Sequence, residues 1–205
     1  RGTIRPGDRC ILGLDVGSTT TKAVLVRCED KVLLASIYLR TKGDPVGAAR
    51  RCYRAIDDQI GKCGMSGDII ILGLGVCGSG RQIAGLHAKT EGVLNEITAH
   101  ATAAAHFDPN VDTIFEIGGQ DAKYTHLVNG VPADYTMNEA CSAGTGSFLE
   151  ESARETMGLH TEQIAEVAIK GRYPPNFNDQ CAAFIASDIK TAIHDGLNHA
   201  DIAAG

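Results

Sequence analysis

The sequence has no excess of positive charge. It contains 19 lysines and arginines against 25 aspartates and glutamates in 205 residues, which gives a formal net charge of −6. A protein that binds nucleic acid by neutralising its phosphates needs a basic surface, and this composition does not supply one. We therefore expect no nucleic-acid partner.

Long apolar stretches and targeting signals are also missing. No apolar run approaches the roughly 18–20 residues that span a bilayer, and no signal peptide or lipidation motif is present. We expect no membrane partner and a cytoplasmic location. The chain begins at Arg1 without a methionine and stops abruptly at Gly205, so we expect it to be a fragment of a larger protein.

The cysteines do not form any CxxC pair. An odd number of cysteines without a signal peptide argues against a disulfide framework and for a reducing compartment. Most of them are expected to be small buried residues. The seven lie at positions 10, 28, 52, 63, 77, 141 and 181.

The first half of the chain shows the pattern of a globular α/β protein. With 43% hydrophobic residues, its length allows one or two domains with a hydrophobic core. The predicted strands are residues 10–16, 23–27, 32–39 and 68–74. The last is predicted to be buried because its Ile-Ile-Ile-Leu run is continuous. A helix is predicted from Pro45 to about Lys62, with Asp44 as its N-cap.

The second half repeats the order of hairpin and helix. A helix is predicted at residues 91–106, and a second meander follows, with Asn129-Gly130 as its hairpin turn. The predicted strands are 112–117, 122–128 and 131–136, and the later helices are 145–157, 161–170 and 179–195. A glycine-containing polar turn thus occurs in two hairpins, which suggests a duplicated phosphate-binding architecture.

The first of these turns is Asp15-Val-Gly-Ser-Thr-Thr-Thr-Lys22. Its backbone N–H groups and hydroxyls can bind phosphate oxygens, and Asp15 can hold Mg²⁺ directly or through water. The candidate phosphate-binding residues are Gly17, Ser18, Thr19, Thr20, Thr21 and Lys22. The spacing is not that of a Walker A loop, and a plain solvated turn is the alternative.

The second turn is Gly118-Gly119-Gln120-Asp121. Gly118 and Gly119 would let the backbone approach a γ-phosphate. Gln120 and Asp121 are residue types that position a hydrolytic water or a hydrated Mg²⁺. A hairpin with a polar tip is the alternative, but two such turns in one chain favour phosphate binding. The candidate catalytic residues are Asp15, Gln120 and Asp121.

A third glycine segment matches the dinucleotide-binding pattern G-x-G-x-x-G. It is Gly73-Leu-Gly-Val-Cys-Gly78, with Glu96 further along the chain. However, Ser79-Gly80-Arg81 is a poor opening for the packed helix that such a site requires, and the preceding strand is the fourth rather than the first. Dinucleotide binding stays an alternative, and it predicts that changing Gly75 abolishes NAD(P) binding.

Two cysteines differ from the others in their surroundings. Cys141-Ser-Ala-Gly-Thr-Gly146 places a thiol at the entry to a helix, where the positive end of the helix dipole favours a thiolate. Cys181 also lies at the start of a predicted helix. Two thiolates cannot complete the ligation of a 4Fe–4S cluster, but two from each of two chains can. The pattern suggests a cluster on a two-fold axis, and two buried thiols are the alternative.

Several motifs together resemble a known family. They are Leu14–Lys22, Glu96–Ala101, Glu116–Lys123 and Met137–Glu150, continued by Cys181–Asp188 and Asp201–Gly205. Over about residues 10–205 they are similar to the activator ATPases of 2-hydroxyacyl-CoA dehydratases and the ATPase subunits of benzoyl-CoA reductase (BadF/BadG/BcrA/BcrD type). The form of Glu116–Tyr124 resembles the large multi-domain members most.

The resemblance implies an ATP-hydrolysing protein with an α/β fold. The fold would be a ribonuclease-H-like domain of the actin, sugar-kinase and heat-shock-chaperone superfamily, followed by the helical start of a second domain. We expect these domains at residues 1–140 and 141–205. ATP and Mg²⁺ would be cofactors, with Ser18–Lys22 on the phosphates and Gln120 and Asp121 facing the γ-phosphate.

The same resemblance implies electron transfer. Cys141 and Cys181 would ligate a 4Fe–4S cluster shared by a homodimer. Reduced ferredoxin or flavodoxin would donate the electron, and ATP hydrolysis would drive it into an acyl-CoA dehydratase or reductase. The sequence departs from the family where a Thr-Gly-Tyr-Gly-Arg-type segment is usual and Val76-Cys-Gly-Ser-Gly-Arg81 stands here. It also lacks the family's later glycine-rich adenosine-binding segment. A sugar- or acetate-type kinase and a non-enzymatic partner-binding protein are the remaining alternatives.

Overall fold

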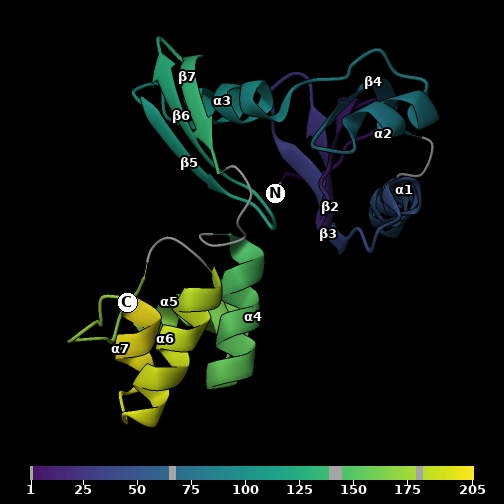
Figure 1. Ribbon diagram of the computed structural model, residues 1–205. Helices are drawn as coiled ribbons and strands as arrows, with labels where there is room; N and C mark the ends of the chain where they lie inside the picture. The colour runs from purple at the N-terminus through teal and green to yellow at the C-terminus, as the bar shows by residue number, and fades with distance from the viewer. Residues whose placement is uncertain (1, 65–67, 139–144, 179–181) are drawn as a thin grey trace. The chain divides into compact units, whose positions relative to one another are not determined.

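The computed structural model describes residues 2–64, 68–138, 145–178 and 182–205 (Figure 1). By its internal contacts the chain divides into two compact units. The first comprises Arg1–Asp112 with Leu127–Ala133, and the second comprises Thr113–His126 with Asp134–Gly205. The domain boundary expected between residues 140 and 141 lies outside the described residues and stays a prediction.

A four-stranded sheet forms the centre of the first unit. Its strands are β1 (Arg9–Val16), β2 (Thr20–Arg27), β3 (Leu33–Arg40) and β4 (Ile70–Cys77), in the order β3-β2-β1-β4. The first three strands pair antiparallel, as the predicted meander requires, whereas β4 runs parallel to β1. A parallel neighbour needs a crossover connection, and the long helix between β3 and β4 provides it.

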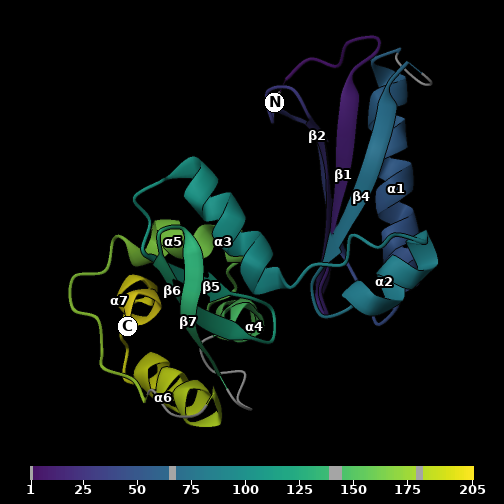
Figure 2. The same ribbon diagram turned by 90° about the horizontal axis from the view of Figure 1, so that it is seen from above.

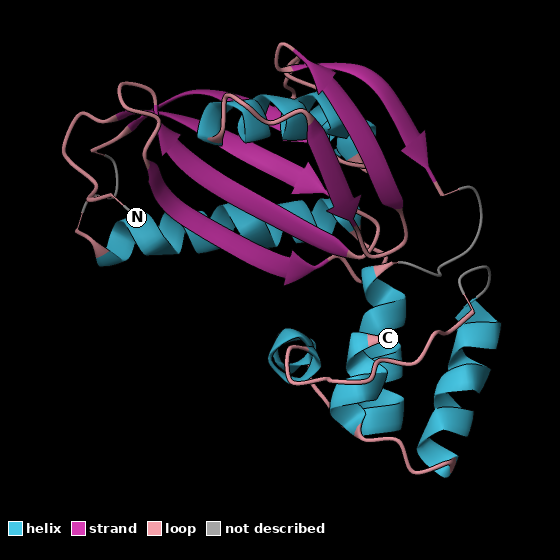
Figure 3. Cartoon of the chain, turned by 90° about the vertical axis from the view of Figure 1, so that its left-hand side faces the viewer, coloured by secondary structure: helices cyan, strands magenta, loops and turns pink. Residues whose placement is uncertain are grey.

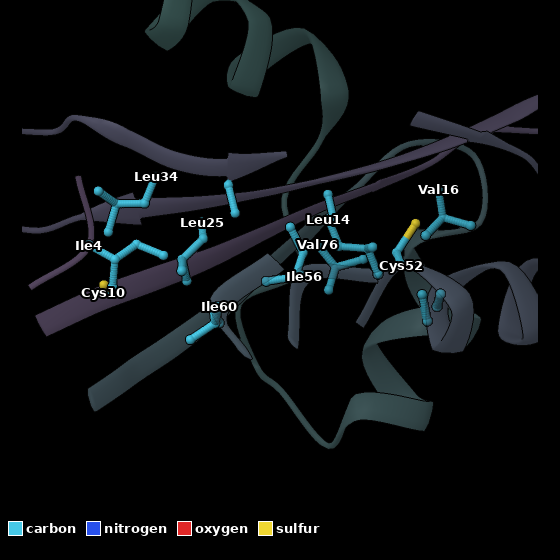
Figure 4. Packing of buried hydrophobic residues seen from close by; sticks show 14 residues of the cluster. Ile4, Cys10, Leu14, Val16, Leu25, Leu34, Cys52, Ile56, Ile60 and Val76 are labelled. Atoms are coloured by element: carbon cyan, nitrogen blue, oxygen red, sulfur yellow. The ribbon is translucent and has the colours of Figure 1, made fainter. Parts of the chain in front are cut away.

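That helix is α1 (Pro45–Lys62), and it begins where the sequence predicts. The carboxylate of Asp44 accepts a hydrogen bond of 2.8 Å from the N–H of Gly47, and Pro45 opens the first turn. Figure 2 shows α1 running along the sheet. Its buried residues are Ala48, Ala49, Cys52, Ile56 and Ile60. Most of these join a core of strand residues that includes Cys10, Leu14, Val16, Leu25 and Val76 (Figure 4).

Strand β4 corrects one prediction about this unit. It spans residues 70–77 rather than 68–74, and it forms an edge of the described sheet. Ile70, Ile71 and Leu72 are 52%, 48% and 47% exposed. The expectation that this continuous apolar run is buried is therefore wrong in this structure.

Two further helices follow β4. Helix α2 (Arg81–Ala88) forms directly after Gly80, although that N-cap has no side chain to bond the first turn, so the segment is a better helix opening than the sequence suggested. Helix α3 (Glu96–Phe107) is shorter than the predicted 91–106 helix at its start. It begins at Glu96 because the side chain of Asn95 accepts a hydrogen bond from the N–H of Ile97.

A second sheet contains β5 (Thr113–Ile117), β6 (Ala122–Val128) and β7 (Val131–Met137), in that order. All three lie within one residue of the predicted strands. Asn129 and Gly130 have φ angles of 54° and 75°. Two successive residues with positive φ form the tight hairpin turn that Asn-Gly favours, which confirms the predicted turn.

The C-terminal part of the chain consists of helices and loops (Figure 3). The helices are α4 (Gly146–Met157), α5 (Thr161–Ala168), α6 (Ala182–His194) and α7 (His199–Ala204). The sequence did not predict α7. Its buried Asp201 accepts hydrogen bonds from the N–H groups of Tyr173 and Arg172, at 2.9 and 2.6 Å, and these bonds hold the pKa of Asp201 below its ordinary value.

The cysteines are less buried than expected. Of the five in the described residues, Cys10 and Cys52 are buried, Cys77 is half-buried, and Cys28 and Cys63 are exposed. The prediction that most cysteines are buried is therefore wrong for this part of the chain. Among the described residues, none of the helices has the length and apolar composition of a membrane span.

A buried charge network closes the end of the first sheet. Arg27, 3% exposed, donates hydrogen bonds to Asp8 Oδ1 at 3.0 Å, to Asp30 Oδ2 at 2.8 Å and to the carbonyl of Thr3. Burial by itself would raise the pKa of Asp8, but the hydrogen bonds from Arg27 and from the Arg5 N–H hold that pKa below its ordinary value. The ion pair therefore stabilises the folded state most when Asp8 is ionised.

We expect Asp8→Asn to lower the melting temperature at pH 7 by roughly 5 °C or more, because it removes the anion that faces a buried guanidinium. The contribution of Asp8 is present above its unfolded-state pKa of about 4 and is lost as pH falls through the lower folded-state pKa. The difference in unfolding free energy from the wild type, measured by denaturant titration, should therefore shrink below about pH 4. Asp58→Asn, on an exposed position of α1, is the control. A difference that stays constant across this pH range would contradict the assignment.

Candidate functional site

The turn between β1 and β2 is closed by its glycine. The N–H of Gly17 donates to the carbonyl of Thr20 at 2.9 Å. A Cβ on Gly17 would lie 2.8 Å from that carbonyl oxygen, closer than Cβ contacts occur, so the turn requires glycine. Ser18 is exposed, and Thr19 and Thr20 are half-buried. The predicted phosphate-binding turn thus presents polar residues at its surface.

Thr41, which the sequence did not indicate, is bonded to this turn from the protein interior. The hydroxyl of Thr41 donates to the carbonyl of Gly17 at 2.7 Å and shares a hydrogen bond of 2.9 Å with the hydroxyl of Thr21. The Thr41 N–H also donates to the carbonyl of Thr19 at 2.9 Å. Thr21 and Thr41 are 0% and 2% exposed. The hydroxyl of Thr21 therefore serves the interior, and its role as a phosphate contact stays a prediction.

Asp15 and Lys22 face each other across the same hairpin. They are register partners of β1 and β2, and their side chains form an ion pair of 2.9 Å. On the other side of β2, the ring of Tyr38 lies 5.5 Å from the ammonium group of Lys22, within the range of a cation–π contact. These two neighbours fix the direction of Lys22, which keeps a charge beside the turn.

The loop after β4 passes close to Asp15. Gly78 has a φ of 91°, and a Cβ there would lie 2.4 Å from Asp15 Oδ1 and 2.6 Å from the carbonyl oxygen of Val16. The N–H of Gly80 donates to the Val16 carbonyl at 2.8 Å. The absence of a side chain therefore lets Gly78 approach one carboxylate oxygen of Asp15, while Lys22 binds the other.

This arrangement fits a magnesium ion that arrives with a nucleotide. Mg²⁺ commonly uses one or two carboxylates together with substrate phosphates and water. Within the described residues no group of three or more His, Cys, Asp or Glu side chains could hold a metal ion by itself. The carboxylate of Asp15 at the edge of the polar turn can supply one ligand of this kind.

The turn between β5 and β6 repeats the geometry of the first turn. The N–H of Gly118 donates to the carbonyl of Asp121 at 2.7 Å, and a Cβ on Gly118 would lie 3.0 Å from that oxygen. Glu116 and Lys123 are register partners and form an ion pair of 3.5 Å, as Asp15 and Lys22 do in the first hairpin. Gln120 and Asp121 are exposed, so this turn also presents polar groups.

The second turn is hydrogen-bonded to the start of α4. The N–H of Gly146 donates to the carbonyl of Gly118 at 2.8 Å, and the N–H of Ser147 donates to the carbonyl of Gly119 at 3.3 Å. A Cβ on Gly146 would lie 3.2 Å from the Gly118 oxygen. Glycine at position 146 therefore allows the helix N-terminus to approach the turn closely.

The other end of the same connection is fixed beside the turn as well. Asn138 and Ala122 exchange two hydrogen bonds: the Ala122 N–H donates to the Asn138 side chain at 2.8 Å, and the Asn138 N–H donates to the Ala122 carbonyl at 3.1 Å. Residues 139–144 join Asn138 to Thr145 along the chain. Both ends of this connection are thus attached at the Gly118–Asp121 turn. The candidate ligands Cys141 and Cys181 lie outside the described residues.

The charge near Gly78 argues against the dinucleotide alternative. The third glycine of that pattern packs against the carboxylate of Asp15 and the carbonyl of Val16, whereas a pyrophosphate would need free N–H groups there. Glu96, the candidate ribose ligand, forms an ion pair of 3.0 Å with Arg81.

One protein-family model matches most of the chain. The model of the BadF/BadG/BcrA/BcrD ATPase family matches residues 12–205. The chain belongs to this family. The predicted family membership is therefore confirmed.

Two relatives and two solved structures illustrate the similarity. The (R)-2-hydroxyglutaryl-CoA dehydratase activating ATPase of Acidaminococcus fermentans is 30% identical over 95% of this chain and 71% of its own length. The crystal structure of that dehydratase component has a TM-score of 0.80, at 28% identity, covering 96% of this chain and 72% of the other. The activator of 2-hydroxyisocaproyl-CoA dehydratase from Clostridium difficile, solved with bound ADPNP, has a TM-score of 0.79, at 27% identity, covering 96% and 70%. A benzoyl-CoA reductase subunit of Thauera aromatica is 26% identical over 94% of this chain and 67% of its own.

These structures also confirm the predicted fold class. The family member shares the α/β fold of these activator structures. Its relatives activate 2-hydroxyacyl-CoA dehydratases or form part of benzoyl-CoA reductase, as the resemblance of the motifs implied.

We expect Thr41→Val to lower the free energy of unfolding by about 1–2 kcal/mol, because it leaves the Gly17 carbonyl and the Thr21 hydroxyl without their shared buried partner. Thr102→Val is the matched control, since that exposed threonine of α3 also loses a hydroxyl that bonds a backbone carbonyl. Urea denaturation of the two variants measures the difference. Equal losses in both would show that Thr41 does not hold the turn.

Proposed function

We propose that this family member is an ATP-hydrolysing activator. It passes a low-potential electron from a 4Fe–4S cluster, shared by two copies of the chain, to a partner of the 2-hydroxyacyl-CoA dehydratase or benzoyl-CoA reductase type. The observation that supports this most strongly concerns the residues on either side of segment 139–144, which contains Cys141. Gly146 and Ser147 are bonded to the Gly118–Asp121 turn, and Asn138 is bonded to Ala122, the residue after that turn. The names of the relatives support the class of partner.

The first turn binds the nucleotide phosphates in this proposal. The exposed and half-buried polar residues Ser18, Thr19 and Thr20 contact phosphate oxygens, and Lys22 supplies a positive charge. Asp15 holds the Mg²⁺ of the nucleotide through its carboxylate, directly or through water. Bound Mg²⁺ would neutralise charge on the phosphates as the terminal bond breaks. The buried bonds of Thr41 keep the turn rigid during this step.

The second turn performs the hydrolysis. Gly118 and Gly119 let the backbone come close to the γ-phosphate, and Asp121, with Gln120, orients the attacking water. Their exposed positions at the tip of the hairpin are suited to reaching a ligand. After the bond breaks, the γ-phosphate no longer holds the turn in place.

The movement of the second turn after hydrolysis is then transmitted to residues 139–144, which contain Cys141. Because the carbonyls of Gly118 and Gly119 accept from the first N–H groups of α4, a shift of the turn pulls on the helix and on the residues before it. Cys141 and Cys181 of each chain would hold the cluster, which supplies one-electron chemistry when bound. Ferredoxin or flavodoxin is the proposed electron donor.

We expect Asp121→Asn to reduce the rate of ATP hydrolysis by about 100-fold or more while nucleotide binding stays within a few-fold of the wild type, because the side chain acts on the water rather than on the nucleotide. Phosphate release and equilibrium binding of a fluorescent ATP analogue measure the two effects separately. Asp134→Asn on β7 is a control at another exposed aspartate. Unchanged turnover in Asp121→Asn would refute this role.

We expect Cys141→Ser and Cys181→Ser each to lose the iron that wild-type protein binds under anoxic conditions, about two atoms per chain for a 4Fe–4S cluster shared by two chains. Cys63→Ser, at an exposed cysteine, should keep it. Iron and sulfide analysis with an absorption spectrum gives the result. Full iron content in either ligand variant would disprove the ligand assignment. A colourless wild-type protein that phosphorylates a small alcohol would instead support a sugar- or acetate-type kinase.

A further inference from the structure

The loop that passes Asp15 is bonded to the side chain of Arg81 as well as to the backbone of β1. The loop consists of Gly78-Ser79-Gly80, and its two glycines lie against the end of β1: Gly78 beside the Asp15 carboxylate, and Gly80 bonded to the Val16 carbonyl at 2.8 Å. Neither glycine has a side chain that could fix the loop. Any restraint must therefore come from backbone bonds and from the residues that follow.

Arg81 supplies such a restraint. Its Nη1 atom donates to the carbonyl of Gly78 at 3.1 Å and to Glu96 Oε2 at 3.0 Å. The side chains of Arg81 and Glu96 are 29% and 20% exposed, so the pair is better shielded from water than a surface ion pair. The guanidinium thus joins the loop to the first residue of α3, whose start is itself capped by Asn95.

We propose that Arg81 is a positioning residue for Asp15. With Glu96, it keeps the Gly78–Gly80 loop against the end of β1, and the loop in turn keeps the carboxylate of Asp15 directed toward the phosphate-bound cation. This inference rests on the proposed ATPase function for its metal, but the positioning of the loop can be tested without any nucleotide.

The test uses Arg81→Met, which keeps the length of the side chain and removes its donors, and Glu96→Gln, which removes only the charge of the partner. In nucleotide-free protein, hydrogen exchange at the Gly80 amide should accelerate about tenfold in Arg81→Met and less in Glu96→Gln, because the loop opens more often. Amides inside α1 should exchange at the wild-type rate. Arg50→Ala is the control, since exposed Arg50 donates to the side chain of His87 at 3.3 Å and not to the Gly78–Gly80 loop.

The second readout is the affinity for Mn²⁺ in the presence of ATP, measured by electron paramagnetic resonance of free Mn²⁺. We expect about tenfold weaker binding in Arg81→Met, an intermediate loss in Glu96→Gln and no change in Arg50→Ala. Wild-type Mn²⁺ affinity in Arg81→Met, or faster exchange spread over α1 as well as Gly80, would overturn the positioning role. Failure of the wild-type protein to bind Mn²⁺ with ATP would overturn the proposed function and with it the metal role of Arg81, whatever the exchange rates show.

Discussion

The hydrogen bond from the Gly146 N–H to the Gly118 carbonyl is the constraint on which the proposed coupling depends. It joins two glycines, so the backbone of a hairpin turn and the N-terminus of α4 meet with no side chain between them. A contact of this kind has little slack, because close-packed backbone cannot deform continuously. A displacement of the turn therefore has to move the helix start or break the bond.

The two hairpin turns share one geometry but differ in what surrounds them. The first turn is fixed from the interior by Thr41 and Thr21, both almost fully buried. The second turn is instead bonded to the helix start that follows the Cys141 segment. The two turns thus share one backbone geometry, but the first is bonded to buried side chains and the second is bonded to the start of α4. This difference matches a division of work in which one turn holds the nucleotide and the other responds to its hydrolysis.

Local signals predicted the parts of the fold that local interactions determine. Asp44 followed by Pro45 fixes the start of α1, and Asn129-Gly130 fixes the hairpin of the second sheet, because each motif encodes its own backbone geometry. Helix α2 was missed because its N-cap, Gly80, bonds the distant Val16 carbonyl rather than capping the helix with a side chain. The run Ile70–Leu72 is apolar like a central strand, yet its position at a sheet edge depends on pairing that the pattern does not encode.

The candidate site also combines residues that local sequence signals indicate with residues that depend on distant contacts. The glycines and polar residues of both turns stand next to each other in the sequence, so a local pattern is enough to propose them as site residues. Thr41 and Asn138 bond residues that lie 24 and 16 positions away, and Glu96, one of the two partners of Arg81, lies 15 positions away. A single threonine, arginine or asparagine gives no signal of such a contact. Finding Thr41 required the pairing of β2 with β3, finding Asn138 required the placement of β7 beside β6, and finding the role of Arg81 required the pairing of β1 with β4.

The most direct test of the coupling compares two nucleotide states of the wild-type protein. The electron paramagnetic resonance spectrum of the reduced protein would be recorded under anoxic conditions with Mg²⁺ and ADP, and again with Mg²⁺ and a non-hydrolysable ATP analogue. We predict a cluster signal whose shape differs between the two states, because in the proposed mechanism the γ-phosphate moves the turn that is bonded to the start of α4. Identical spectra, or no cluster signal in either state, would contradict the proposed coupling.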